Sequence, residues 1–220
     1  READSLHTRV LQNNSVYAGM VEDIDTAVGR VLETIKKENL SDNTVVIFMS
    51  DNGGLSTAQA YATSNIPLKA GKGWMYEGGI RVPMMIKWPG VTKPNTVCDT
   101  PVTSTDFFPT ILDMAGLPLM PSQHKDGVSL VPVLKGNKLN REAIFWHYPH
   151  YGGQNGAPAS AVRSGDWKLI KWYEDNKVEL FNLKQDISET YNQANLYPET
   201  TSKLKKQLED WLKKINAKYP

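Results

Sequence analysis

The fold is decided by the stretch Val45-Val46-Ile47-Phe48-Met49-Ser50-Asp51-Asn52-Gly53-Gly54. Its first five residues are all apolar and rich in β-branched side chains, which is typical of a strand covered on both faces. Upstream, residues 16–35 carry apolar side chains at steps of three and four, which predicts an amphipathic helix. A helix followed by such a strand predicts an α/β fold with a buried parallel strand at 45–49.

The rest of the first 141 residues adds few further elements. Residues 82–88 predict a second strand, and Ser104 is placed to cap a helix that runs to Met114. Between them, residues 50–81 are rich in glycine and follow no period, and a connection of this length is usually functional or disordered. Two strands and two helices cannot cover a strand that is apolar on both faces. We therefore expect the remaining layers to come from elsewhere, with the chain as part of a longer protein.

The pattern changes at about residue 142. Four short strand-like runs are separated by turn residues, at 143–148, 160–163, 167–172 and 178–181. A helical stripe follows, formed by Leu204, Leu208, Trp211, Leu212 and Ile215. We predict a small α+β domain at 142–220, with an antiparallel four-stranded sheet packed by a C-terminal helix, after a larger α/β domain at 1–141.

Composition excludes several classes of function. The 220 residues include 25 Lys+Arg and 24 Asp+Glu, a net charge of +1, which argues against nucleic acid or an anionic membrane as the main partner. No apolar run approaches the roughly 18 residues needed to span a bilayer. The single cysteine, Cys98, cannot form an internal disulfide and lacks the paired spacing of a zinc site.

Two segments contain residues suited to binding a metal ion or an anion. Asp51 and Asn52 follow the buried strand, where ligands bind in open α/β sheets, and they offer hard oxygen donors suited to Ca²⁺ or Mg²⁺. At most about three oxygens are available there, so a metal needs further ligands. Lys72 lies between Gly71 and Gly73, which leave room for an anion to approach its ammonium group. From spacing alone, a turn and a solvated surface lysine are the simpler interpretations.

Several motifs in this chain resemble those of the type I sulfatases, in the family's order and over nearly the whole sequence. They are residues 20–32, 48–54, 71–73, 76–83, 104–110, 126–130 and 179–183 with Asp186 and Glu189. The resemblance implies an alkaline-phosphatase-like fold, of which the chain is the C-terminal portion: a mixed-sheet α/β sandwich followed by the small α+β domain. It also implies hydrolysis of sulfate esters to alcohol and inorganic sulfate.

The resemblance also implies roles for three residues. Asp51 and Asn52 match one pair of the family's metal ligands, normally for Ca²⁺, with Mg²⁺ as the alternative. Lys72 matches the lysine that binds the sulfate group, which agrees with the need for fixed positive charge where an anionic transition state forms. His147 and His150, in an aromatic-rich loop, are candidate contacts to the substrate, and ordinary packing is the alternative.

The chain also lacks two features of the family pattern. The nucleophile of these enzymes is a formylglycine made from the Cys or Ser of a C-x-P-S-R type motif, and Cys98 in Val97-Cys98-Asp99-Thr100-Pro101 does not fit it. The first metal-binding Asp pair is also missing. We therefore expect formylglycine and the first half of the metal site in a preceding N-terminal part, and no sulfatase turnover by this chain alone.

The sequence is also compatible with two other functions. One is a phosphodiesterase or phosphonate hydrolase of the same superfamily, and another is a binding or interaction module without catalysis. Within the sulfatase reading, the expected substrates are sulfated small molecules or glycans, and the expected setting is periplasmic, extracellular or lysosomal. A homo-oligomer is one way to keep the apolar strand covered.

Overall fold

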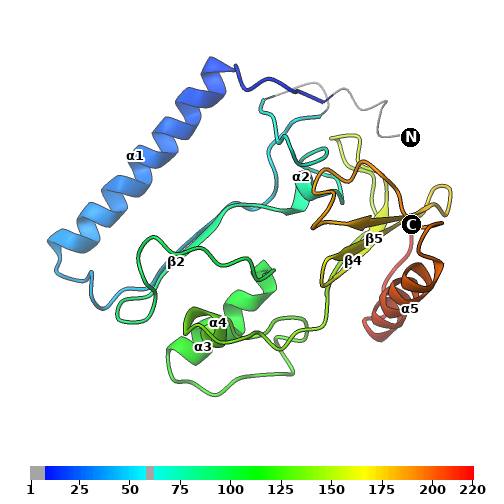
Figure 1. Cartoon of the computed structure of the whole chain (residues 1–220). Helices are drawn as coiled ribbons and strands as arrows, with labels where there is room; N and C mark the ends of the chain where they lie inside the picture. Colours follow the sequence, from blue (N-terminus) through cyan, green and yellow to red (C-terminus); the bar gives the residue numbers. More distant parts are fainter. Residues whose placement is uncertain (1–7, 58–61) are drawn as a thin grey trace. The chain divides into compact units, whose positions relative to one another are not determined.

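The computed structural model describes residues 8–57 and 62–220. The chain divides into two compact units, one formed by Arg1–Val31, Met49–Met84 and Phe145–Pro220, the other by Leu32–Phe48 and Met85–Ile144. Figure 1 labels the α-helices that the structure describes and the strands β2, β4 and β5. None of the helices in the described ranges is long and apolar enough to cross a membrane. The domain boundary expected between residues 141 and 142 stays a prediction.

The centre of the first unit is a four-stranded sheet in the order β3-β4-β5-β6. These strands are β3 (Ile144–Tyr148), β4 (Ala159–Ser164), β5 (Trp167–Trp172) and β6 (Val178–Asn182). β4 pairs antiparallel with β5, with Ala161 opposite Ile170, and β5 pairs antiparallel with β6. The four strands predicted from alternation and turn residues are thus confirmed, each within two residues of its expected bounds.

Helix α5 (Pro198–Lys214) packs on β4 and β5, as Figure 1 shows. Its buried side chains are Leu204, Leu208 and Leu212, which are four residues apart and therefore lie on one helical face. Trp211 adds a stacked contact with Phe145, with ring centroids 4.9 Å apart. This helix is the C-terminal helix predicted from the same residues.

The other face of the sheet packs against the segment 70–76. Ala159, Ala161, Ile170, Trp172 and Phe181 alternate along the strands and form one core with Ala70, Trp74, Met75 and Tyr76. Because successive side chains of a strand point to opposite faces, this face and the α5 face are both filled. The glycine-rich segment downstream of residue 50 is therefore anchored to the sheet by aromatic side chains.

The second unit is organised around Asp106. Its carboxylate accepts hydrogen bonds from the backbone N–H groups of Thr103 (2.9 Å) and Val128 (3.0 Å), and it pairs with Arg141 at 2.6 Å. It lies at the start of α3 (Phe107–Met114), after the 3₁₀ turn η2 (Ser104–Asp106). The predicted helix at 104–114 is confirmed. The short helix α4 (Val131–Leu134) was not predicted, because four residues show no period.

The first strand is present, but the part of the chain that the structure describes does not cover both of its faces, which is the deficit expected from the number of elements. The elements involved are α1 (Ser15–Lys37), β1 (Val46–Met49) and β2 (Met84–Lys87), and β1 and β2 pair as a two-stranded sheet. Phe48 is exposed, and no described residue of α1 is buried. The apolar pattern at 45–49 correctly predicts a strand, but the two-stranded sheet leaves Phe48 exposed and its other three residues only partly buried.

Candidate functional site

The end of β1 turns sharply at Gly53 and Gly54. The Gly53 N–H group donates to the Gly79 carbonyl at 2.9 Å, and the Ser50 hydroxyl donates to the Asn52 carbonyl at 2.9 Å. An added Cβ at Gly53 would lie 1.7 Å from the Gly78 carbonyl oxygen, so glycine is required by this close backbone approach. The turn leaves Asp51 exposed and Asn52 half-buried.

The lysine loop, residues 71–73, is attached directly to this turn. The Lys72 N–H group donates to the Gly54 carbonyl at 3.1 Å, and the same carbonyl accepts a hydrogen bond from the Asn65 side chain at 2.8 Å. Asn65 also donates to the Ala70 carbonyl at 2.9 Å. One backbone hydrogen bond therefore joins the segment of Lys72 to the segment of Asp51 and Asn52, two features that are 20 residues apart in the sequence.

The side chains of these three residues are available for ligands. In the part of the chain that the structure describes, Asp51, Asn52 and Lys72 have no side-chain hydrogen bond or ion pair. Lys72 is exposed, and Gly73 beside it has a φ of 87°, which favours glycine. Two unengaged oxygen donors and an unengaged ammonium group suit a hard cation and an anion, respectively.

A metal site is not complete within the described ranges 8–57 and 62–220. No group of three or more His, Cys, Asp or Glu side chains there could hold a metal ion. Asp51 and Asn52 fit the oxygen chemistry of Ca²⁺ or Mg²⁺, but they fill less than half of a shell of about six to eight ligands.

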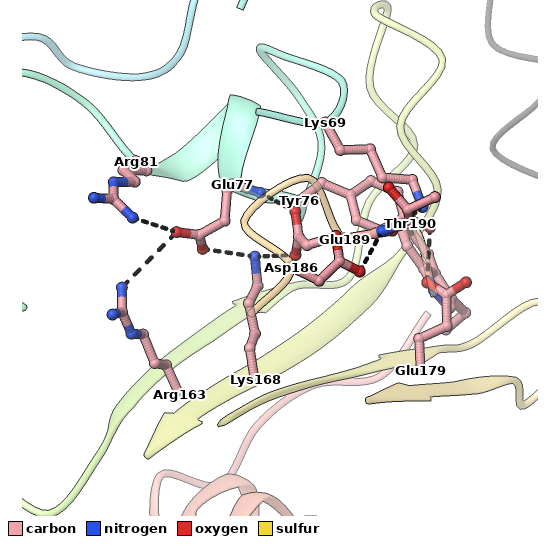
Figure 2. Close-up of polar contacts among 11 residues, drawn as sticks. Lys69, Tyr76, Glu77, Arg81, Arg163, Lys168, Glu179, Asp186, Glu189 and Thr190 are labelled. Carbon is pink, nitrogen blue, oxygen red and sulfur yellow. Dashed lines mark hydrogen bonds and ion pairs between the residues drawn. The ribbon is translucent and has the colours of Figure 1, made fainter. Parts of the chain in front are cut away.

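A buried ionic cluster lies next to the lysine loop, at the short helix α2 (Glu77–Ile80). The Lys168 ammonium, which is fully buried, lies 3.0 Å from Glu77 Oε1 and 2.8 Å from Glu189 Oε1. Glu189 Oε2 accepts a hydrogen bond of 2.6 Å from the Glu77 N–H group. Burial raises the pKa of the Glu189 carboxyl, and the adjacent Lys168 ammonium acts against that rise. Figure 2 shows Lys168 between the two carboxylates.

Two arginines complete this cluster. Arg81 and Arg163 each place a guanidinium nitrogen 3.8 Å from Glu77 Oε2 (Figure 2). Through these contacts Glu77 joins α2 to Arg163 of β4 and Lys168 of β5. The part played by Lys168 was missed. Lys168 lies within the largely apolar strand β5. Its sequence position alone does not indicate an ion pair, because the partner Glu77 lies in α2, far away in the chain.

A second set of contacts joins the lysine loop to the sheet through aromatic residues. The Tyr76 hydroxyl donates to Glu179 Oε2 at 2.7 Å, and Trp172 Nε1 donates to the same oxygen at 2.9 Å. Lys69 Nζ lies 4.1 Å from the centre of the Tyr76 ring and donates to the Glu189 carbonyl at 2.8 Å. Partial burial lowers the pKa of Lys69, although Glu179 and Glu189 oppose the shift. These contacts fix the backbone on both sides of Lys72.

The two candidate histidines differ in their surroundings. His147 Nδ1 lies 2.7 Å from the Ser160 hydroxyl, and its Nε2 lies 2.8 Å from the Lys218 carbonyl oxygen, so both ring nitrogens have protein partners. His150 is exposed and its ring packs edge-on against Tyr148, with centroids 5.5 Å apart. A substrate contact by either histidine stays a prediction. Cys98 is exposed and has no disulfide partner.

Comparison with known proteins gives two overlapping family matches. Residues 1–117 match the sulfatase family model, and residues 70–218 match the model of the C-terminal part of N-sulphoglucosamine sulphohydrolase. A sulfatase of Formosa agariphila is 39% identical over 225 residues, which cover 91% of this chain and 40% of that protein. Arylsulfatase K of Rattus norvegicus is 32% identical over 87% of this chain and 34% of its own length.

Solved structures give the same result. The crystal structure of Ps i-CgsB with k-i-k-neocarrahexaose has a TM-score of 0.80 at 33% identity and covers 92% of this chain and 44% of that one. The structure of BT4656 with its substrate D-glucosamine-2-N,6-O-disulfate has a TM-score of 0.74 at 30% identity, over 88% of this chain and 39% of that one. The chain thus spans less than half the length of these relatives. Its two family matches together cover residues 1–218, and it belongs to the sulfatase family.

Proposed function

We propose that this chain contributes the sulfate-binding lysine and one pair of metal ligands to a sulfatase. In this proposal Lys72 binds the sulfate group of a sulfate ester, and Asp51 and Asn52 hold Ca²⁺ or Mg²⁺ together with ligands from outside the chain. The observation that supports it best is the hydrogen bond from Lys72 N–H to the Gly54 carbonyl, which joins the two segments.

The chemistry follows from the charges. A sulfate ester is an anion, and negative charge builds up on the leaving oxygen as its S–O bond breaks. An ammonium group fixed beside that oxygen lowers the barrier, because it favours the transition state more than the ground state. A bound divalent cation would supply further positive charge against the sulfate oxygens. The chain has no residue in the nucleophile motif, so the attacking group, expected to be formylglycine, has to come from another part of the protein.

The substrate and setting are further parts of the proposal. Two similar structures were solved with an oligosaccharide and with a disulfated glucosamine, which favours a sulfated glycan here. A sulfated small molecule is the alternative. We also propose a periplasmic, extracellular or lysosomal setting, and we retain homo-oligomerisation as an expectation.

A titration of the isotope-labelled chain with sodium sulfate, followed by NMR, tests the lysine assignment. We expect amide shifts at residues 71–73, with the apparent Kd raised about tenfold or more in Lys72→Ala. Lys203→Ala, which removes an exposed lysine from α5, is the matched control and should bind as wild type does. Equal sulfate binding by Lys72→Ala and wild type would refute the role of Lys72.

A parallel titration with calcium chloride tests the ligand pair. We expect shifts confined to residues 50–54 and weak binding, because the chain offers at most about three oxygens of a shell of about six to eight. Asp51→Ala should abolish these shifts, whereas Asp166→Ala, which changes an exposed aspartate in the β4–β5 turn, should keep them. Calcium shifts at other residues, or shifts that survive Asp51→Ala, would contradict the assignment.

A further inference from the structure

A pocket of about 250 Å³ lies between the loop 151–157 and the turn that joins β5 to β6. Its floor is formed by the aromatic side chains of Trp74, Tyr76 and Trp172. This volume is below the roughly 300–1,000 Å³ of pockets that hold drug-sized ligands, so it suits a single ring-sized unit.

The pocket shares its wall with the lysine loop. An added Cβ at Gly156 would lie 1.9 Å from the Gly73 carbonyl oxygen, so the backbones of the two loops are in direct contact. Trp74 Nε1 donates to the Gln154 carbonyl at 3.0 Å, which fixes the loop over the aromatic floor. A ligand in the pocket would therefore lie beside the loop that carries Lys72.

The charges of the lining favour hydroxyl donors over anions. Three carboxylates line the pocket, from Glu174, Asp175 and Glu179, against the single ammonium group of Lys177. Lys177 Nζ lies 3.2 Å from Glu179 Oε1 and is therefore already paired. Glu179 is already occupied by Tyr76, Trp172 and Lys177. A second sulfate would be repelled here, whereas sugar hydroxyls can donate to the remaining lone pairs of Glu174 and Asp175.

The aromatic surface supports the same ligand. The rings of Trp74, Tyr76 and Trp172 pack with centroids 5.5 to 6.1 Å apart, which makes the floor rigid. Tyr151 lines the pocket and is 69% exposed, and its hydroxyl is hydrogen-bonded to Glu174. The exposed ring can pack against the apolar C–H face of a sugar. Apolar ring surface combined with an excess of hydrogen-bond acceptors matches an uncharged pyranose.

We propose that this pocket binds an unsulfated sugar unit, as a second contact for the glycan whose sulfate ester is bound by Lys72. The link to a glycan sulfate rests on the proposed function, whereas binding of a neutral sugar by the pocket stands on the lining alone. The pocket would then select glycans by the unit next to the sulfated one.

Saturation-transfer NMR on the chain tests this pocket with a set of neutral monosaccharides: D-galactose, D-glucose, L-fucose and N-acetyl-D-glucosamine. We expect at least one to bind with a Kd in the millimolar range and to shift the amides of residues 151–157. Tyr151→Ala and Glu174→Gln should each weaken that sugar about tenfold. Tyr191→Ala, which removes a tyrosine of similar exposure, should leave the affinity unchanged.

The outcomes separate the two proposals. Binding of none of the four sugars, or equal binding by wild type and Tyr151→Ala, would overturn the pocket proposal. Binding of D-galactose 6-sulfate at residues 151–157 as tight as that of D-galactose would overturn the charge argument. Lys72→Ala should abolish sulfate shifts at 71–73 and keep the neutral-sugar shifts, so a failure of either site is detected independently of the other.

Discussion

At the scale of single residues, the candidate site depends on glycines that let backbone segments touch. Gly53 contacts the carbonyl of Gly78, and Gly71 has no space for a side chain because an added Cβ would lie 2.3 Å from the Gly54 carbonyl oxygen. The sequence predicts a sharp turn at 53–54 and an open approach to Lys72. It does not predict that the two loops touch, because the identity of a glycine does not show which distant residues lie next to it in space.

Gly53→Ala should therefore destabilise the chain by about 1–3 kcal/mol, since overpacking forces the backbone to shift. The matched control is Gly29→Ala in α1, where nothing lies within 4 Å of the added Cβ and alanine is favoured by up to about 1 kcal/mol. Urea unfolding followed by circular dichroism measures both. A Gly53→Ala variant as stable as wild type would contradict the close contact with Gly78.

The buried ionic cluster is also a residue-scale feature. Replacing Lys168 with methionine leaves the carboxylates of Glu77 and Glu189 buried without their shared cation. Removing one partner of a buried ion pair costs about 3–5 kcal/mol. We expect Lys168→Met to lose stability in that range by chemical denaturation.

Lys184→Met, at an exposed lysine, serves as the comparison and should change stability by less than about 0.5 kcal/mol. If Lys168→Met were neutral or stabilising, the buried contacts of Lys168 with Glu77 and Glu189 would not stabilise the fold.

At the scale of elements, the sequence predicts best where the period is regular. The four strands of the sheet and helix α5 follow from alternation, turn residues and four-residue spacing, and all are present. The incomplete cover of β1 also follows from the sequence, because residues 1–141 contain too few elements to cover it. An apolar run does not say which segments would cover the strand. The contacts of Lys168 and Glu189 were missed because they join segments that are about 90 to 110 residues from Glu77.

The packing of α5 makes an element-scale prediction. Leu208 is fully buried between the helix and the sheet, so Leu208→Ala should destabilise the chain by about 2–5 kcal/mol through lost burial and a residual cavity. Lys205→Ala, on the exposed face of the same helix, should stay within about 0.5 kcal/mol of wild type. Thermal unfolding of both variants measures the difference, and similar values for the two would show that α5 does not depend on this contact.

At the scale of the whole molecule, the candidate metal site has fewer ligands than a metal ion needs, and the family match offers a reason. The chain belongs to the sulfatase family, yet it spans less than half the length of its relatives and offers two metal-ligand candidates instead of a full shell. Asp51, Asn52 and Lys72 could be chosen from the sequence through their motifs. Their proximity could not, because it depends on the Gly54 carbonyl, which accepts from the backbone of Lys72.

The most direct test is the hydrolysis of 4-nitrophenyl sulfate by the longer protein of which we propose this chain is a part. Lys72→Ala there should lower kcat/KM by about 10²–10³, the usual loss when one charge-stabilising group is removed, with unchanged thermal stability. The isolated 220-residue chain should show no turnover. A Lys72→Ala enzyme as active as wild type, or measurable hydrolysis by the isolated chain that is abolished by Lys72→Ala, would contradict the account.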